Sequence, residues 1–254
     1  MIEICAIASG SNGNCYYIGN SETAILIDVG ITRKQVLMRM AQKNLNPNKI
    51  KAIFVSHEHT DHSCGARVLS AKINVPVFMT YETLKGSWHK FHPKKTIFFK
   101  QGEIIKIGDF AVHTFLKQHD AEAPCSFRVE YSGINVGVFT DLGAPCKSVI
   151  SNLQKCHALF LESNYDEEML WTGSYPDHLK LRISSDYGHL SNNQAFELLK
   201  KYHNPNLKLV LLSHLSQENN RPEIAMAAFK ELEKKFEIKL TNRYEAGDVF
   251  TISL

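Results

Sequence analysis

The sequence lacks the features of several large protein classes. Only six of its 254 residues are cysteines, and none forms a CxxC pair. A disulfide scaffold is therefore excluded, and we expect reduced thiols in a cytoplasmic protein. No apolar run approaches the ~18 residues of a membrane span. The first residues lack the basic and long apolar regions of a signal peptide, so we expect no membrane partner.

Repeats, low-complexity tracts and Pro/Gly/Ser-rich linkers are also missing, which favours a single domain over residues 1–254. Hydrophobic residues make up 44% of the chain and charged residues 22%, as in ordinary globular proteins. The formal net charge is +3. This mild basic excess is compatible with an anionic substrate but does not require one.

Short apolar segments alternate with amphipathic ones. We predict strands at residues 2–8, 15–18, 23–28, 51–56, 75–80, 96–99, 103–107, 110–116, 125–131, 135–140, 158–162, 207–213 and 249–253. We predict helices at residues 33–44, 65–72, 191–202 and 222–236. The first half is rich in strands, and the pattern then partly repeats. This indicates two sheets in contact and covered by helices, in an α/β or α+β fold.

Histidine is the one unusual residue, with twelve copies, and several of them cluster in the segment His57-Glu58-His59-Thr60-Asp61-His62. The predicted strand 51–56 delivers this segment to its own carboxyl end. Alternate residues of an extended chain face the same way, so His57 and His59 can face one ion. Asp61 and His62 can reach a second ion as the chain turns. Imidazole and carboxylate ligands suit Zn, Mn or Fe.

Two less specific interpretations are weaker. Four ligand-type side chains in six residues are too many for an ordinary polar surface loop. A closed structural zinc site usually contains cysteine pairs and leaves no open position.

Further ligands are expected where other predicted strands end. Asp141 follows the strand 135–140, and His214 follows the strand 207–213. The third histidine is either His113, inside the strand 110–116, or His119, beyond its end. Ligands tend to converge in loops at strand ends, which favours His119.

At this point HEHTDH resembles the HxHxDH signature of the metallo-β-lactamase superfamily, and the resemblance extends over nearly the whole chain. It implies an α+β fold, a four-layer αββα sandwich. It also implies a hydrolase with two divalent metal ions, Zn or Mn. The implied metal ligands are His57, His59, Asp61, His62, His119, Asp141 and His214. Asp28, in LIDVG, is expected to orient a ligand histidine through its other ring nitrogen.

Within the superfamily, SGSNGNCYYI, QHDAEAPCSF and SHLSQENNRPE resemble the YycJ/WalJ-like group. That group is linked to 5′→3′ exonuclease activity on double-stranded DNA, which implies a nucleic acid substrate, with DNA favoured. GHLSNNQA and LLSHLS are also similar to RNase Z-type phosphodiesterases. That similarity implies that His189 protonates the leaving group and that Glu162 orients it. Asp61 would orient the attacking water or accept its proton.

Other functions remain open at this stage. They are an RNase Z-like or cyclic phosphodiesterase, a thioester hydrolase of the glyoxalase II kind, and a non-catalytic nucleic-acid-binding protein. The turn Ser9–Asn14 is either a phosphate-binding nest of backbone N–H groups or a tight turn beneath the metal loop. Residues 219–221 are candidates for lining a substrate channel.

Overall fold

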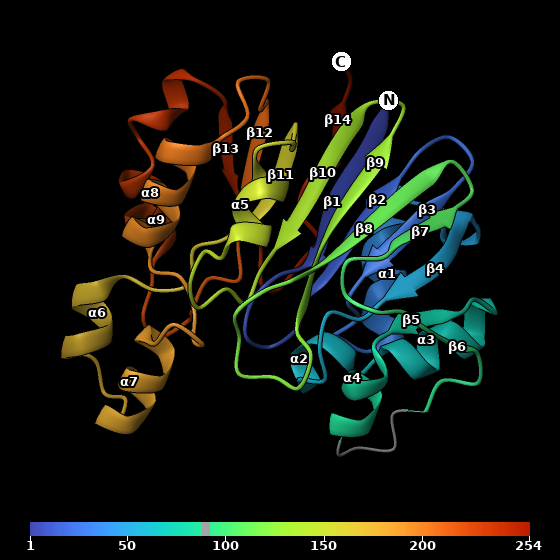
Figure 1. Ribbon diagram of the computed structural model, residues 1–254, viewed down its shortest axis with the longest axis horizontal. Coiled ribbons are helices and arrows are strands. Elements are labelled where there is room, and N and C mark those ends of the chain that lie inside the picture. Colours follow the sequence, from blue (N-terminus) through green and yellow to red (C-terminus); the bar gives the residue numbers. More distant parts are fainter. Residues whose placement is uncertain (88–91) are drawn as a thin grey trace.

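The computed structural model describes residues 1–87 and 92–254 and shows two facing seven-stranded sheets (Figure 1). The first sheet contains β1 (Ile2–Ala8), β2 (Cys15–Gly19), β3 (Ala24–Ile27), β4 (Ile50–Phe54), β5 (Val77–Met79), β6 (Thr96–Phe98) and β14 (Phe250–Ile252). The second contains β7 (Ile104–Ile107), β8 (Phe110–Leu116), β9 (Cys125–Tyr131), β10 (Ile134–Phe139), β11 (Ala158–Glu162), β12 (Leu209–Ser213) and β13 (Glu237–Leu240).

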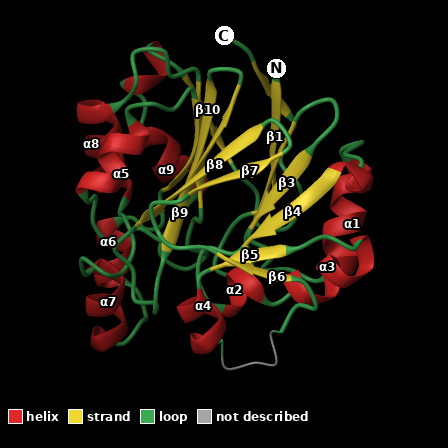
Figure 2. Cartoon of the chain, turned by 45° about the vertical axis from the view of Figure 1, so that its right-hand side comes forward, coloured by secondary structure: helices red, strands yellow, loops and turns green. Residues whose placement is uncertain are grey.

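Helices accompany both sheets (Figure 2). On the side of the first sheet they are α1 (Arg33–Gln42), α2 (Thr60–Ser63), α3 (Ala66–Ile73) and α4 (Tyr81–Gly86). On the side of the second they are α5 (Lys147–Leu153), α6 (Glu167–Thr172), α7 (Asp177–Ser184), α8 (Asn192–Tyr202) and α9 (Pro222–Ala228). The order helix, sheet, sheet, helix confirms the predicted four-layer sandwich. No helix among the described residues has the length and apolar character needed to cross a membrane.

The core between the sheets explains why so many strands read as apolar runs. Phe54, Phe110, Phe127 and Phe160 belong to one buried cluster that both sheets contribute to. The opposite faces of the sheets are also covered, by the helices. Each fully buried large apolar side chain contributes roughly 1.5–3 kcal/mol relative to an exposed one, so burial on both faces stabilises the strands.

Both sheets have the same internal arrangement. The first runs in the order β14-β1-β2-β3-β4-β5-β6, antiparallel as far as β3 and parallel from β3 onward. The second runs β7-β8-β9-β10-β11-β12-β13, antiparallel as far as β10 and parallel beyond it. Asp28 follows β3 in the sequence IDVG, and Asp141 follows β10 in TDLG. Each half thus presents an aspartate where its sheet changes from antiparallel to parallel.

The predicted helix over residues 222–236 is wrong beyond Ala228. Helix α9 ends there, a short 3₁₀ turn follows at Leu232–Lys234, and β13 begins at Glu237. The mixture of charged and apolar residues in this segment is compatible with a helix. However, the chain enters β13 at Glu237, which pairs with Leu209 of β12, so the helix has to end before this tertiary pairing begins. The short helices α4 to α7 were not predicted from the sequence.

Candidate metal centre

The loop after β4 is held against the start of the chain by close backbone contacts. The backbone N–H of Asn14 donates to the carbonyl of Asp61 at 2.8 Å, and the N–H of Gly30 donates to the carbonyl of Asn14 at 2.8 Å. A Cβ atom on Gly30 would lie 1.6 Å from the Asp61 carbonyl oxygen. Only glycine permits this approach. The glycine of LIDVG therefore sets the position of the histidine-rich loop.

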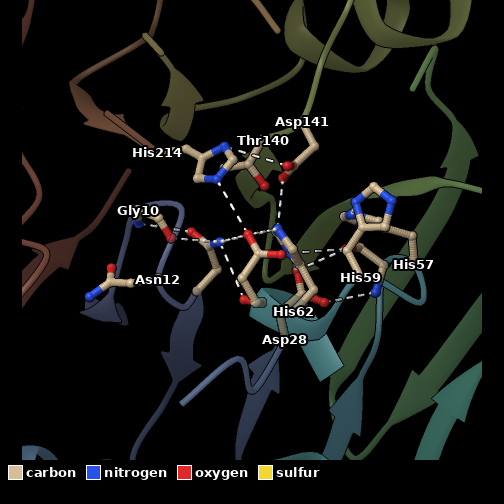
Figure 3. Close-up of polar contacts among 12 residues, drawn as sticks. Gly10, Asn12, Asp28, His57, His59, His62, Thr140, Asp141 and His214 are labelled. Atoms are coloured by element: carbon tan, nitrogen blue, oxygen red, sulfur yellow. Dashed lines mark hydrogen bonds and ion pairs between the residues drawn. The ribbon is translucent and has the colours of Figure 1, made fainter. Parts of the chain in front are cut away.

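Three histidines form the first group of candidate ligands. The Nε2 atom of His57 lies 3.1 Å from Nδ1 of His59, and Nε2 of His119 lies 3.4 Å from the same atom. His57 and His119 are buried and His59 is partly exposed. Figure 3 shows His57 and His59 side by side. Their ring nitrogens are close enough to one another to share one ion.

A second group lies beside the first and consists of Asp61, His62 and His214. The Oδ2 atom of Asp61 lies 3.4 Å from Nε2 of His62 and 3.6 Å from Nε2 of His214. Asp141 lies between the two groups. Its Oδ2 atom is 3.1 Å from Nε2 of His62, and its Oδ1 atom is 3.8 Å from Nε2 of His119. Asp141 therefore faces ligand atoms of both groups, and Figure 3 shows its side chain pointing toward His62.

Two atoms in this cluster show that the residues fit a metal. Oδ2 of Asp141 and Nε2 of His214 are buried and form no hydrogen bond with the described residues. Buried polar atoms normally have a partner, because an unpaired one costs about 1–3 kcal/mol. Both atoms belong to residues expected to bind metal. A divalent cation would satisfy them, and imidazole with carboxylate is a donor set that Zn and Mn accept.

The histidines differ in how their surroundings affect proton binding. Burial lowers the pKa of His57 well below its usual range and that of His119 to about 3. Burial also acts to lower the pKa of His214, but the charge of Asp141 and neighbouring carboxylates raise it to about 10. The pKa of His62 is raised for the same reason. Without ions, His62 and His214 hold protons that a metal would displace.

Asp28 lies behind His62 and fixes the orientation of its ring. The Oδ2 atom of Asp28 is 2.8 Å from Nδ1 of His62. Ser56 donates to the same carboxylate, from its backbone N–H at 2.8 Å and from its hydroxyl at 2.9 Å. With Nδ1 engaged by the carboxylate, Nε2 of His62 is left to face the cluster. This is the orienting contact predicted for Asp28.

The backbone is strained at three positions of the site. Asp28, Asp141 and His214 have φ values of 60°, 57° and 57°. This left-handed conformation is uncommon for residues other than glycine and costs about 1–3 kcal/mol at each position. Because the three residues all touch the cluster, the strain is concentrated where the side chains must converge.

His189 and Glu162 form a pair at the edge of the cluster. Nδ1 of His189 lies 2.8 Å from Oε1 of Glu162, which also lies 2.9 Å from Nδ1 of His214. The second oxygen of Glu162 accepts from the backbone N–H of Leu142 at 2.6 Å. Charge and hydrogen bonding from His189 and His214 outweigh burial and lower the pKa of Glu162 to about 2. An ionised, firmly held Glu162 therefore orients the ring of His189.

The ring of His189 lies within reach of both ligand groups. Its centroid is 5.3 Å from that of His119 and 5.2 Å from that of His214. The side chain is 18% exposed, whereas that of Glu162 is fully buried. Its Nε2 atom has no hydrogen-bond partner among residues 1–87 and 92–254. This nitrogen is therefore available to a substrate.

Lys117 was not predicted from the sequence. Its side chain is fully buried, and its ammonium group donates to the carbonyl of Thr140 at 2.8 Å and lies 3.9 Å from Oδ2 of Asp141. Burial alone would raise the pKa of Asp141, but the charges of His214, His62 and Lys117 hold it well below its usual range. The available signal was a lysine immediately after an apolar strand, two residues before His119.

The sequence left two questions open: whether His113 or His119 is the third histidine, and what the Ser9–Asn14 turn does. His113 lies away from the cluster, where its Nε2 atom is 3.1 Å from Glu130. The structure thus brings His119, and not His113, beside His57 and His59. The Ser9–Asn14 segment is a tight turn beneath the metal loop. The amide of Asn14 lies 3.1 Å from Nε2 of His62, and its Oδ1 atom accepts from the N–H of Gly10.

Known proteins resemble this chain in both sequence and fold. Residues 8–214 match the Metallo-beta-lactamase superfamily. The exodeoxyribonuclease YycJ of Bacillus anthracis is 33% identical over 92% of this chain and 90% of its own. The metallo-beta-lactamase fold protein YhfI of Bacillus subtilis superposes with a TM-score of 0.71 at 17% identity, covering 98% of this chain and 100% of its own. Human tRNase Z, short form, superposes with a TM-score of 0.67 at 16% identity, covering 99% of this chain and 100% of its own. The family match, the sandwich and the converging histidines and aspartates agree, and the chain belongs to the metallo-β-lactamase superfamily.

Proposed function

We propose that this chain is a two-metal phosphodiesterase that degrades DNA as an exonuclease. The observation that carries the proposal is the His189–Glu162 pair, at 2.8 Å, beside the candidate metal ligands. Similarity to the exodeoxyribonuclease YycJ over 92% of the chain supports DNA as the substrate. The six free cysteines and the DNA substrate favour a cytoplasmic location.

In this proposal the metal ligands are the seven residues His57, His59, Asp61, His62, His119, Asp141 and His214. When bound, two adjacent divalent ions supply an activated water and neutralise charge on the phosphate. Zn and Mn both suit this donor set. Asp61, 25% exposed, is the ligand carboxylate that reaches solvent, and it orients the water or accepts its proton.

His189 acts at the other end of the bond that breaks. Glu162 accepts from Nδ1–H of His189, and in the imidazolium form of His189 the Nε2 atom also carries a proton, which is the one that is transferred. That proton goes to the oxygen of the departing nucleotide as the bond from phosphorus to that oxygen breaks. Glu162 is held by the backbone N–H groups of Leu142 and Leu190, so the imidazole keeps one orientation throughout. General acid catalysis of this kind contributes typically ~10²–10⁴-fold.

The test is hydrolysis of duplex DNA labelled at either the 5′ or the 3′ end, with the protein loaded separately with Mn or Zn. We expect progressive release from the ends, abolished in Asp61→Ala. We expect His189→Ala to lose about 10²–10⁴-fold in rate with its metal content unchanged. The matched control is His113→Ala, which removes a carboxylate-bound histidine away from the cluster.

Several outcomes would contradict the proposal. Fully metallated wild-type protein that leaves duplex DNA intact would exclude the exonuclease, and RNA, cyclic phosphodiesters and thioesters would be tested next. If His189→Ala and His113→Ala lost activity equally, His189 would have no role in departure of the leaving group.

A further inference from the structure

A cavity of about 320 Å³ lies next to the candidate metal centre and takes no part in the chemistry described so far. Its lining comes from three loops: the turn after β1, the segment that follows His214, and the loop after β13. Among the lining residues are Ser9, Gln217, Asn220, Thr241, Arg243 and Tyr244. The volume is at the lower end of the ~300–1,000 Å³ typical of small-ligand sites. It suits one nucleotide unit rather than a longer segment.

Direct contacts join this cavity to the metal centre. The hydroxyl of Ser9, in the lining, accepts from the backbone N–H of His214 at 2.9 Å. Arg243 donates to the side chain of Asn12 at 3.0 Å. In the same turn, the N–H of Gly10 donates to Asn14, whose amide nitrogen lies 3.1 Å from Nε2 of His62. A group bound in the cavity would therefore be close to a substrate atom held at the metals.

Arg243 is the cation of this cavity, and it lacks an anionic partner. Its two fixed contacts are the side chain of Asn12 and, at 2.5 Å, the carbonyl of Leu215. Both are neutral acceptors, and Arg243 forms no ion pair with any carboxylate of the described residues. A guanidinium has five N–H donors, so several remain for a ligand. Planar, forked donors of this kind match the oxygens of a phosphate.

The guanidinium of Arg243 also packs against the backbone of the turn after β1. A Cβ atom on Gly10 would lie 2.9 Å from its Cζ atom, so the guanidinium packs directly on the glycine. Burial lowers the pKa of Arg243, and the charge of Asp61 is among those that oppose the shift. The guanidinium of Arg243 is therefore a half-buried cation, fixed against Gly10 and Asn12, and it can bind an anion in the cavity.

Tyr244 provides an aromatic surface beside that cation. Its side chain is 67% exposed, and its hydroxyl donates to Oε1 of Gln217 at 3.2 Å, which fixes the ring at the rim of the cavity. Stacking of a base on an aromatic ring is worth about 1–3 kcal/mol and tolerates any base. A phosphate-binding cation next to an exposed ring is the combination that binds a single nucleotide without reading its sequence.

We propose that this cavity binds the nucleotide adjoining the scissile phosphate, with Arg243 binding the phosphate of that nucleotide and Tyr244 stacking on its base. The inference rests on the proposed function, since it assigns a subsite to the same substrate.

The test is equilibrium binding of a fluorescein-labelled single-stranded DNA decamer to the metal-loaded His189→Ala protein, followed by anisotropy at several salt concentrations. Adding Arg243→Gln should weaken binding about tenfold or more, as expected for loss of a charge-assisted hydrogen bond. It should also lower the slope of log K against log [salt] by about 0.7, the value for one single-strand phosphate contact. The matched control is Arg67→Gln, which removes an exposed arginine of α3 and should leave the slope unchanged.

A second variant tests the same cavity independently, in case Arg243→Gln does not fold. Gln217→Glu keeps the acceptor for the Tyr244 hydroxyl and adds a negative charge to the lining. It should weaken decamer binding several-fold. The proposed subsite is wrong if both variants, with wild-type metal content, bind the decamer as tightly and with the same salt slope as the parent. A parent that does not bind the decamer at all, together with wild-type protein that does not cleave DNA, would instead overturn the proposed function.

Discussion

The molecule has a second, half-buried cluster of histidine, arginine and carboxylate, and its polar atoms are satisfied differently from those of the metal centre. It lies on the face of β8 and β9 that α5 covers. Arg128 donates to Asn152 at 2.9 Å and to Glu130 at 3.4 Å, and it also contacts Asn135. Glu130 also binds His113, at 3.1 Å.

In this second cluster the side chains of Glu130 and His113 are 43% and 19% exposed, so water can reach their polar atoms, whereas the metal centre has two buried, unpaired polar atoms, on Asp141 and His214. Both clusters contain histidines and carboxylates within hydrogen-bonding distance. A count of potential ligands therefore does not separate them. Buried polar atoms that converge without protein partners do separate them, because such atoms are costly unless something outside the chain binds them.

The two clusters should differ most in metal content and hydrolysis rate when one carboxylate is removed from each. Asp141→Ala should lose bound metal and at least about 10³-fold in hydrolysis rate, since a metal ion supplies several kcal/mol of transition-state stabilisation. Glu130→Ala should stay within about twofold of wild type, as surface changes usually do. Metal analysis and initial rates check both. If Asp141→Ala still bound two ions, the proposal that Asp141 is a metal ligand would be wrong.

A smaller difference should appear when the buried cation of each cluster is removed. Lys117→Met should lower the free energy of unfolding of the chelated protein by about 2–3 kcal/mol, because Asp141 loses a compensating charge. With metal bound, the loss should be smaller, since the ions provide that charge. Arg128→Met should cost about 2 kcal/mol with or without metal, because its partners never contact an ion. Urea unfolding with and without chelator measures all four values, and a Lys117→Met loss that is the same in both states would contradict the expectation.

The smallest effect concerns the pH dependence of the unfolding free energy, and it should be the same for a buried cysteine near each cluster. Burial raises the pKa of the Cys156 thiol, near Arg128, and of the Cys125 thiol, near Lys117, to about 12 from an ordinary 9.0. The unfolded chain loses these protons first, so each thiol stabilises the fold fully below about pH 9. That stabilisation is lost progressively up to about pH 12, by at most about 1.4 kcal/mol per pH unit for each thiol. Cys156→Ala and Cys125→Ala should each flatten the decline in unfolding free energy between pH 9 and pH 10.5. A wild-type stability that does not fall in this range would show that the folded thiols ionise as readily as the unfolded ones.

Much of the fold followed from the sequence because apolar runs and amphipathic stretches are local signals. The four-layer sandwich was predicted by resemblance, and the structure confirms it. The helices α6 and α7 were missed because they are short and their apolar faces are small. The strand β13 was not predicted, because it has only four residues, directly follows the segment predicted as a helix, and is defined by its pairing with β12.

The candidate site was predictable to the extent that its residues are contiguous. The segment 57–62 follows a buried strand, and the structure brings its side chains together as expected. Lys117 gave no such signal, because its role depends on Asp141, which lies 24 positions further along the chain. The choice between His113 and His119 depended on where β8 ends. The assignment of individual residues as ligands, and of the whole chain as one domain, stays a prediction.

The repeated sheet arrangement has a consequence for how the protein becomes active. The half of the chain before β7 holds Asp28 and the histidine-rich loop, and the half after it holds His119, Asp141 and His214. Neither half contains a complete set of candidate ligands. The centre exists only along the seam where the two halves dock, so a nascent or partly unfolded chain has no functional centre. Assembly of the candidate centre therefore requires both halves of the chain to be folded and docked.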